Sequence, residues 1–441
     1  MLKFGTDGVR GVANVELTAE LVLALGRSAA RVLGPAPFLV GRDTRRSGPL
    51  LQAALTAGLT AEGVDVVDLG VLPTPAVAYA SQERQLPAAV ISASHNPYQD
   101  NGVKFFLAGG RKLPDDVEAR LEKVLADGPE AGPATPEPVG TATSDPDAVT
   151  SWIAHILASC DRLSGLHIVL DCANGAATTA APRALRALGM QVTVVNADPN
   201  GRNINAACGC THPAGLQRAV VESGADAGLA LDGDADRVLA VDHTGALVDG
   251  DQLLALFARD MHAAGTLHGD TVVITVMANS GLRVAMAGAG IAVHETPVGD
   301  RSVLEALEAG GWSLGGEQSG HLIFRDLATT GDGTLTGALL LGLVRRRGKP
   351  LAELAAGAMT RLPQVLRSVT VAERAGLDDA ASVWEEVAAV EASLAGRGRV
   401  LLRPSGTEPV VRVMVEAATP EEAGRAADRL VAAVAAALGR G

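Results

Sequence analysis

The chain of 441 residues has few aromatic residues and few cysteines. Phe, Trp and Tyr make up 2% of it, while 47% of all residues are hydrophobic. This balance favours helices packed on sheets over an all-β fold. Four cysteines are too few for a disulfide framework in a chain of this length, and Cys208-Gly-Cys210 lacks the second pair that a zinc site needs. We therefore expect reduced, structural thiols at Cys160, Cys172, Cys208 and Cys210.

Long apolar runs and an excess of positive charge are also absent. "GALLLGLVRRR" is too short to cross a bilayer, and "MLKFGTDGVRG" has no apolar region of a secretory signal. The formal net charge of −13 argues against binding nucleic acid or acidic lipid, although a local basic pocket can still hold a small anion. We expect a cytoplasmic protein with small-molecule partners, no nucleic acid and no membrane.

One structural unit occurs three times, at residues 37–70, 167–196 and 271–300. Each stretch reads strand, polar loop, amphipathic helix, glycine, strand, with Gly63, Gly189 and Gly290 at the helix ends. The runs "HIVL" and "VVITV" lack alternation, as expected of strands that helices cover on both faces. The pattern predicts three tandem α/β domains with mixed sheets.

The remaining stretches suggest the domain boundaries. Residues 126–147 are rich in Pro, Gly, Ala, Thr and acids, which is typical of a solvated loop or linker. Residues 399–439 read strand, turn, strand, helix, and "TPEE" is a good helix start. We predict α/β domains at 1–150, 151–250 and 251–365, and a smaller α+β domain at 366–441.

Three carboxylates interrupt two apolar runs in "LALDGDADRVLAV". Asp232, Asp234 and Asp236 have the spacing to converge on one hard cation such as Mg²⁺. An EF-hand loop is excluded because its sixth position is Arg237 and its twelfth is His243. A solvated acidic turn is the alternative, but three carboxylates between buried strands would repel one another without a cation.

The turn in "RPSGTEPVVR" predicts a phosphate site. Hydroxyls, backbone N–H groups and guanidinium groups are what a phosphate dianion needs. They come here from Arg403, Ser405, Gly406, Thr407 and Arg412. Taken alone, this stretch fits an ordinary Pro-Ser-Gly turn equally well. The possible metal cluster of Asp232, Asp234 and Asp236 makes the phosphate site the better interpretation.

The stretch "LGGEQSGHLIF" sets Glu317, Ser319 and His321 at spacing two. Glu and Ser so placed can bind adjacent sugar hydroxyls. Counted with Gly316 as the first residue, the serine is fourth, whereas the G-x-S-x-G nucleophile elbow of a hydrolase has it third. A Ser-Gly turn that caps a helix is the alternative.

The stretch "ISASHNPYQDNGVK" contains Ser94, His95 and Lys104 at the end of a buried strand. A Ser-His hydrolase needs a third group and an oxyanion hole, and the spacing supplies neither. We expect a supporting role for His95. Lys104 is one of only five lysines among 37 basic residues, which suggests a compact, titratable donor. A simple Asn-Pro turn remains the alternative.

The whole set of motifs resembles the α-D-phosphohexomutase family. The stretches are, in order, "FGTDGVRG", "GRDTRRSG", "ISASHNPYQDNGVKFF", "DGDADR", "GGEQSGH", "TGDG" and "RPSGTEP". The resemblance implies four domains around a central cleft, each giving one loop: phosphoserine, metal-binding, sugar-binding and phosphate-binding. "FGTDGVRGVAN", "NGRNINAACGCTHP" and Gln318 are most similar to members that act on glucosamine phosphates. Phosphomannomutase or phosphoglucomutase activity is the runner-up.

The resemblance also implies a role for each matching residue. Ser94 would be a phosphoserine whose phosphate holds one Mg²⁺ with Asp232, Asp234 and Asp236. The groups beside the reacting oxygens would be Arg10, Lys104 and His321. The groups that bind the sugar phosphate would be Arg237, Glu317, Ser319, Arg403, Ser405, Gly406, Thr407 and Arg412.

The implied reaction interconverts glucosamine 6-phosphate and glucosamine 1-phosphate through a sugar 1,6-bisphosphate, for amino-sugar nucleotide and cell-wall precursor synthesis. The enzyme would be a monomer or a homodimer. A metal-dependent sugar-phosphate phosphatase would use the same acids but transfer the phosphate to water. A noncatalytic sugar-phosphate sensor would need neither Ser94 nor the metal.

Overall fold

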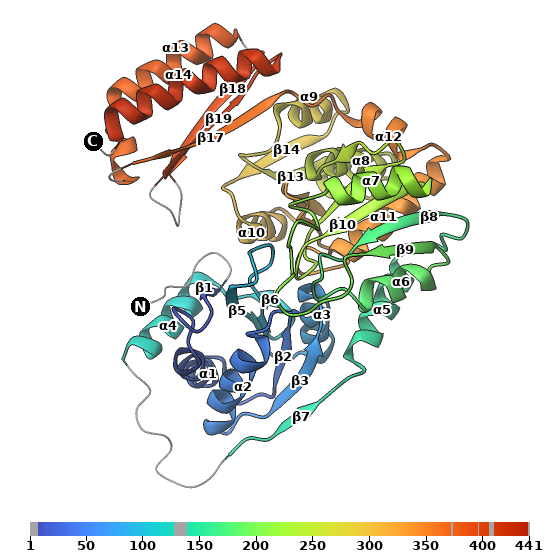
Figure 1. Ribbon diagram of the computed structural model, residues 1–441, viewed down its shortest axis with the longest axis vertical. Coiled ribbons are helices and arrows are strands. Elements are labelled where there is room, and N and C mark those ends of the chain that lie inside the picture. Colours follow the sequence, from blue (N-terminus) through green and yellow to red (C-terminus); the bar gives the residue numbers. More distant parts are fainter. Residues whose placement is uncertain (1–7, 128–138, 372–373, 396, 405–409, 440–441) are drawn as a thin grey trace. The chain divides into compact units, whose positions relative to one another are not determined.

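The computed structural model describes residues 8–127, 139–371, 374–395, 397–404 and 410–439. The chain forms two compact units, the first made of Met1–Met277 and Ile291–Gly357 and the second of Ala278–Gly290 and Ala358–Gly441. Three mixed α/β sheets belong to the first unit and an antiparallel sheet to the second (Figure 1). Three α/β domains and a C-terminal domain, as predicted, account for this architecture. The boundaries at 150, 250 and 365 stay predictions.

The sheet of the first domain is mixed, in the order β1-β5-β4-β2-β3-β7 with β6 beside β5. β2, β3, β4 and β7 run parallel, and the pairs of β5 are antiparallel. The strands are β1 (Val9–Val12), β2 (Phe38–Arg42), β3 (Val66–Val71), β4 (Ala88–Ile91), β5 (Asp100–Leu107), β6 (Arg111–Lys112) and β7 (Ala142–Ser144). The helices are α1 (Ala19–Leu33), α2 (Gly48–Ala61), α3 (Thr74–Arg84) and α4 (Asp115–Ala126).

The predicted linker contains a short strand. Its residues 128–138 lie outside the described part, but Ala142–Ser144 form β7, which pairs with β3. All three side chains of β7 are exposed. A strand without a buried face has no hydrophobic pattern, which is why the sequence indicated only a loop.

Two glycines allow the first two helices to touch. A Cβ at Gly26 of α1 would lie 2.5 Å from the carbonyl oxygen of Leu55, and a Cβ at Gly58 of α2 would lie 2.2 Å from that of Leu23. Both distances are shorter than any real Cβ contact. The pair therefore packs backbone to backbone over a core that includes Phe38, Leu51, Leu59 and Ile91.

The second and third domains repeat the parallel strand–helix–strand unit. The second sheet, in the order β12-β11-β10-β8-β9, contains β8 (His167–Asp171), β9 (Gln191–Val195), β10 (Ala227–Leu231), β11 (Val238–Asp242) and β12 (Leu247–Val248). The third, in the order β14-β13-β15-β16, contains β13 (Thr271–Thr275), β14 (Ala292–Thr296), β15 (Leu314–Gly316) and β16 (Leu322–Phe324). The helices of this part of the chain are α5 (Ala148–Ser159), α6 (Ala180–Ala187), α7 (Ala214–Ser223), α8 (Gly250–Ala264), η1 (His268–Asp270), α9 (Ser280–Gly288), α10 (Asp300–Gly310), α11 (Gly333–Arg347) and α12 (Leu351–Ala358).

The predicted glycine positions and buried strands are confirmed. Gly63, Gly189 and Gly290 follow α2, α6 and α9 with φ of 83°, 99° and 73°, the left-handed conformation that ends many helices. All five residues of β13 are buried, as are four of the five in β8. The three repeated units are therefore α/β units, as the sequence indicated.

The C-terminal domain is an antiparallel sheet with helices on one face (Figure 1). Its elements are β17 (Gln364–Thr370), η2 (Arg374–Leu377), α13 (Ala381–Leu394), β18 (Arg399–Pro404), β19 (Val410–Glu416) and α14 (Pro420–Leu438). Thr419 caps α14 by accepting a hydrogen bond from the Glu422 N–H at 3.2 Å, so the predicted "TPEE" helix start is confirmed.

All four cysteines are free thiols. Among the described residues, no helix is long and apolar enough to span a membrane.

Candidate active site

Three of the predicted clusters directly follow buried strands of the first unit. Ser94 follows β4, Asp232 follows β10, and Glu317 follows β15. β4 pairs in parallel with β2, β10 with β8 and β15 with β13. The carboxyl ends of parallel strands are where α/β proteins place their ligand sites. The sheets therefore explain why polar residues interrupt apolar runs at these points.

Ser94 contacts the acidic cluster across a separation of 138 residues. Its Oγ donates a hydrogen bond to Oδ2 of Asp232 at 2.6 Å. The side chain is buried, and its backbone φ is +49°, a left-handed value that non-glycine residues rarely adopt. The loop after β4 and the loop after β10 thus meet at this serine.

His95 lies beside Ser94 as a neutral ring. Its Nδ1 is 3.3 Å from the Ser94 Oγ. Burial, together with the positive charges of Arg237 and Arg10, lowers the pKa of His95 to about 4. The imidazole therefore carries no charge at neutral pH, which is consistent with the supporting role that we expected.

The three aspartates form a buried carboxylate cluster. Asp232 and Asp234 are inaccessible and Asp236 is 4% exposed, and one oxygen of each lies within 4.8 Å of the others. Burial and the charges of Asp236 and Asp234 raise the pKa of Asp232 well above its ordinary value. Among the described residues, none donates a hydrogen bond to the Oδ1 atom of Asp234 or of Asp236. Two such buried oxygens in a set of hard ligands fit a divalent cation.

Two cationic side chains partly balance this cluster. Lys104 Nζ on β5 lies 2.9 Å from Asp234 Oδ2 and 3.8 Å from Asp236 Oδ2. Arg237 Nε lies 3.7 Å from Asp236 Oδ1. Lys104 is 2% exposed, so the rare lysine that the sequence singled out is a buried partner of the acids. Thr74 also donates to Asp234 Oδ2 at 2.7 Å, a contact that the sequence did not predict.

His321 lies between two carboxylates in a fully buried position. Its Nδ1 is 3.6 Å from Asp236 and its Nε2 is 3.7 Å from Asp300. Burial lowers the pKa of His321, but these two carboxylates outweigh burial and raise it. The Gly331 N–H donates to Nε2 at 3.1 Å, and this bond needs the neutral ring. Opposing requirements of this kind suit a residue that exchanges a proton.

The loop after β15 presents Glu317 and Ser319 together. Ser319 Oγ donates to Glu317 Oε2 at 3.2 Å, and the Gly299 N–H donates to Glu317 Oε1 at 3.0 Å. The Gln318 amide donates to Asp251 in α8 at 3.0 Å, so it fastens the loop to the helix. The prediction that Glu317 and Ser319 bind sugar hydroxyls is untested.

Arg10 is near the same serine. It is on β1, where it pairs with Gly102 of β5, and a Cβ at Gly102 would lie 2.9 Å from the Arg10 Cγ. The same Cβ would lie 2.7 Å from the carbonyl oxygen of Ser92, so the Arg10 stem lies beside the segment that leads into the Ser94 loop. The positive charge of Arg10 also lowers the pKa of His95. The roles of Arg10, Lys104 and His321 beside the reacting oxygens stay predictions.

The residues predicted to hold phosphate belong to the second unit. Arg403 of β18 and Arg412 of β19 are direct partners in the antiparallel ladder. Cross-strand partners project from the same face of a sheet, so the two guanidinium groups share a face. Ser405, Gly406 and Thr407 lie outside the described residues.

Ion pairs between the first and third domains were not predicted. Lys112 contacts Asp300, and Arg301 contacts both Asp115 and Glu118, the latter at 2.5 Å. The segment that carries Asp300 and Arg301 begins α10, directly after the Gly299 N–H that binds Glu317. Charged residues at a helix start have an ordinary solvated role, so the sequence held no signal for these contacts.

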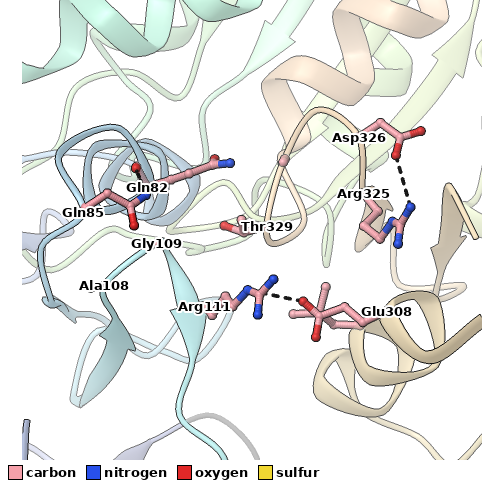
Figure 2. Close-up of a pocket in the computed structure, with 11 residues that line it drawn as sticks. Gln82, Gln85, Ala108, Gly109, Arg111, Glu308, Arg325, Asp326 and Thr329 are labelled. Atoms are coloured by element: carbon pink, nitrogen blue, oxygen red, sulfur yellow. Dashed lines mark hydrogen bonds and ion pairs between the residues drawn. The ribbon is translucent and has the colours of Figure 1, made fainter. Parts of the chain in front are cut away.

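A separate cavity of about 820 Å³ lies between the first and third domains (Figure 2). Arg111 and Glu308 face each other across it at 3.5 Å, and Arg325 and Asp326 form a pair at its side. None of the predicted site residues that the structure describes lines this cavity. The carboxylate cluster is therefore a separate site.

Comparison with known proteins decides the family. Four models described as Phosphoglucomutase/phosphomannomutase, alpha/beta/alpha domains I, II and III and C-terminal domain, match residues 1–131, 147–245, 249–362 and 366–433. The chain belongs to the phosphoglucomutase/phosphomannomutase family. The four matches follow one another along nearly the whole sequence, as the motifs did.

Within this family, the chain is similar in sequence to phosphoglucosamine mutases. Phosphoglucosamine mutase of Rhodococcus opacus is 53% identical over 98% of this chain and 99% of its own, and that of Thermobifida fusca is 54% identical over 97% and 96%. A family protein from Burkholderia thailandensis superposes with a TM-score of 0.82 at 27% identity, covering 99% of both chains. N-acetylphosphoglucosamine mutase of Aspergillus fumigatus, solved with GlcNAc-6P and magnesium, shares the fold with a TM-score of 0.71 at 21% identity, covering 99% and 96%.

Proposed function

We propose that the chain is a phosphoglucosamine mutase, an isomerase that interconverts glucosamine 6-phosphate and glucosamine 1-phosphate. The observation that carries this proposal is the hydrogen bond of 2.6 Å between Ser94 Oγ and Asp232, which joins a serine to a buried cluster of metal-ligand type. Relatives more than 50% identical along almost the whole chain are phosphoglucosamine mutases. The product would feed amino-sugar nucleotide and cell-wall precursor synthesis in the cytoplasm, and the enzyme would be a monomer or a homodimer.

Asp232, Asp234 and Asp236, with the phosphate on Ser94, would hold one Mg²⁺. The two buried Oδ1 atoms that accept no hydrogen bond from any described residue support this assignment. When bound, the ion offsets negative charge on the transferring phosphoryl group. Lys104, 2.9 Å from Asp234, adds a second positive charge at the same place.

The chemical step is a transfer from phospho-Ser94 to the free hydroxyl of the bound sugar phosphate. The hydroxyl oxygen forms a bond to phosphorus as the bond between phosphorus and the Ser94 Oγ breaks, and the product is the 1,6-bisphosphate. Arg10, Lys104 and His321 would lie beside the reacting oxygens and handle the hydroxyl proton. The bisphosphate then rebinds with its ends exchanged and returns its other phosphate to Ser94.

The remaining residues would bind the part of the sugar phosphate that does not react. Glu317, Ser319 and Arg237 would contact sugar hydroxyls, and the contact between Ser319 and Glu317 supports a shared role. The non-reacting phosphate would be held by Arg403, Ser405, Gly406, Thr407 and Arg412. We assign these loops to four domains bounded near residues 150, 250 and 365.

A substrate comparison tests the proposal. The full chain with Mg²⁺ is incubated with the 6-phosphates of glucosamine, glucose and mannose, and ³¹P NMR follows the 1-phosphates and inorganic phosphate. We expect the highest kcat/KM with glucosamine 6-phosphate. A higher value with glucose or mannose phosphate would replace the substrate assignment, and stoichiometric inorganic phosphate would identify a phosphatase.

A further inference from the structure

The backbone of Ser94 is held in an unfavourable conformation. Its φ of +49° is left-handed, and serine has neither the freedom of glycine nor the local hydrogen bonding that helps asparagine there. Such a conformation persists only where the surrounding structure imposes it, and such residues gather at functional sites. The groups that impose it on Ser94 can be identified from their hydrogen bonds.

Arg45 binds the backbone of this loop from the first domain. Its guanidinium is fully buried and forms an ion pair with Asp43 at 2.8 Å. Its other donors bind carbonyl oxygens: Nη2 donates to those of Ser94 and Asn96, both at 2.9 Å, and Nη1 to that of Asp100 at 2.9 Å. A buried arginine whose N–H groups donate to several carbonyl oxygens of one loop holds the backbone of that loop in place.

Asn205 binds two of the same carbonyls from the second domain. Its Nδ2 donates to the carbonyl oxygen of Ser94 at 2.9 Å and to that of Asn96 at 3.0 Å. Asn205 lies in the stretch "NGRNINAACGCTHP", which resembles family members that act on glucosamine phosphates, and the reaction described above gives it no role. It is 111 residues from Ser94 and is 7% exposed.

The loop that carries Asp232, Asp234 and Asp236 packs closely against the Ser94 backbone and Asn205 at Gly233. A Cβ at Gly233, between two of the aspartates, would lie 2.5 Å from the Ser94 carbonyl oxygen and 2.8 Å from the Asn205 Nδ2. Only glycine allows the Ser94 loop, Asn205 and the acidic loop to meet here. The hydrogen bonds to the Ser94 carbonyl are thus on the same side as the cluster that its Oγ contacts.

We propose that Arg45 and Asn205 are positioning residues for phosphoryl transfer. Together they grip the carbonyl oxygens of Ser94 and Asn96 from two domains, hold Ser94 in its left-handed conformation, and direct its Oγ to Asp232. This rests on the proposed function of Ser94 as the phosphoserine. A phosphoryl group misplaced by about 1 Å reacts up to about a hundredfold more slowly, so a clamp on the loop backbone acts on kcat.

Asn205→Asp is the decisive variant because it keeps the shape of the side chain and replaces the amide donor by an oxygen that repels both carbonyls. Asn203→Ala is the matched control: it removes two side-chain hydrogen bonds in the same segment, one donated to the carbonyl of Asp198 and one accepted from the Asn200 N–H, and neither involves the Ser94 loop. Arg45→Lys keeps the charge but loses the fork that reaches several carbonyls.

For Asn205→Asp and Arg45→Lys we expect kcat to fall about 10- to 100-fold with KM changed less than about twofold. Phosphorylation of Ser94 by glucose 1,6-bisphosphate, followed by intact mass, should slow by the same factor. Asn203→Ala should match the wild type. A wild-type kcat in Asn205→Asp, or an equal loss in Asn203→Ala, overturns the proposal.

Hydrogen exchange tests whether Arg45 and Asn205 hold the Ser94 loop independently of whether the proposed function is correct. Because it needs no turnover, it reports on the loop even if the wild type proves inactive on every sugar phosphate. We expect amide exchange in a peptide that covers residues 93–101 to accelerate at least about tenfold in Asn205→Asp and to remain unchanged in Asn203→Ala. Unchanged exchange in Asn205→Asp shows that the amide does not hold the loop.

Discussion

Arg403 and Arg412 are direct partners across the antiparallel ladder of β18 and β19, so two guanidinium groups project from one face of the C-terminal sheet. A phosphate dianion bound at this face would accept charge-assisted hydrogen bonds from both guanidinium groups. The register of one strand pair thus supports the phosphate site proposed from the sequence.

Replacing one of these arginines should weaken substrate binding. Arg412→Ala removes a charge-assisted contact of roughly 1.5–3 kcal/mol, so we expect KM for glucosamine 6-phosphate to rise about tenfold or more. The fold should stay intact, because the backbone pairing of β18 with β19 does not depend on this side chain. Steady-state kinetics and calorimetry measure both, and a wild-type KM would speak against the phosphate site.

Loss of the Ser94 hydroxyl should stop the reaction without unfolding the chain. Ser94→Ala should lose at least about a thousandfold in kcat and show no phosphorylated species in intact mass analysis. Ser94→Gly should be equally inactive yet about 1 kcal/mol more stable than Ser94→Ala, because glycine accepts φ of +49°. Ser223→Ala, at an exposed helix end, serves as the control. Turnover at the wild-type rate in Ser94→Ala is the contrary outcome.

Magnesium should stabilise the folded chain through the carboxylate cluster. Among the described residues none donates a hydrogen bond to the Oδ1 of Asp234, so this oxygen suits a cation and millimolar Mg²⁺ should raise the melting temperature by linkage. Asn at position 234 presents an amide N–H₂ group or a neutral oxygen instead. We therefore expect Asp234→Asn to lose most of the Mg²⁺-induced shift, as scanning calorimetry with and without EDTA would show. An equal shift in both proteins would place the ion elsewhere.

Stability should also depend on pH through Asp332, which caps α11. Burial raises the pKa of Asp332 to about 6, against hydrogen bonds from Leu335 N–H and Trp152 Nε1 that lower it. The folded chain therefore binds more protons than the unfolded chain between pH 4 and 6, and this contribution to stability falls as the pH rises through that window.

The comparison with Asp332→Asn isolates this group. The stability of the wild type minus that of the variant should decrease by on the order of 1–3 kcal/mol between pH 4 and pH 6. Urea unfolding at several pH values measures this difference. Parallel curves for the two proteins would mean that Asp332 titrates at its ordinary pKa.

Local signals explain which features could be predicted. Asp232, Asp234 and Asp236 are neighbours in the sequence, so their spacing alone predicted a cluster. Gly63 was predictable because a helix end favours glycine whatever lies around it. Asn205 lies in a stretch that the family resemblance singled out, but no local pattern indicated its contacts, since its partners are 111 and 109 residues away. Contacts between domains depend on packing that no local pattern encodes.

The short strand β7 has a practical consequence for cutting this chain into parts. It lies within the segment that the sequence predicted to be a linker, yet it completes the edge of the first sheet by pairing with β3. A fragment that ended before Ala142 would leave the apolar strand Val66–Val71 with a bare edge, which is a template for aggregation. A soluble first domain therefore has to extend beyond Ser144, and the apparent linker is part of what keeps neighbouring molecules apart.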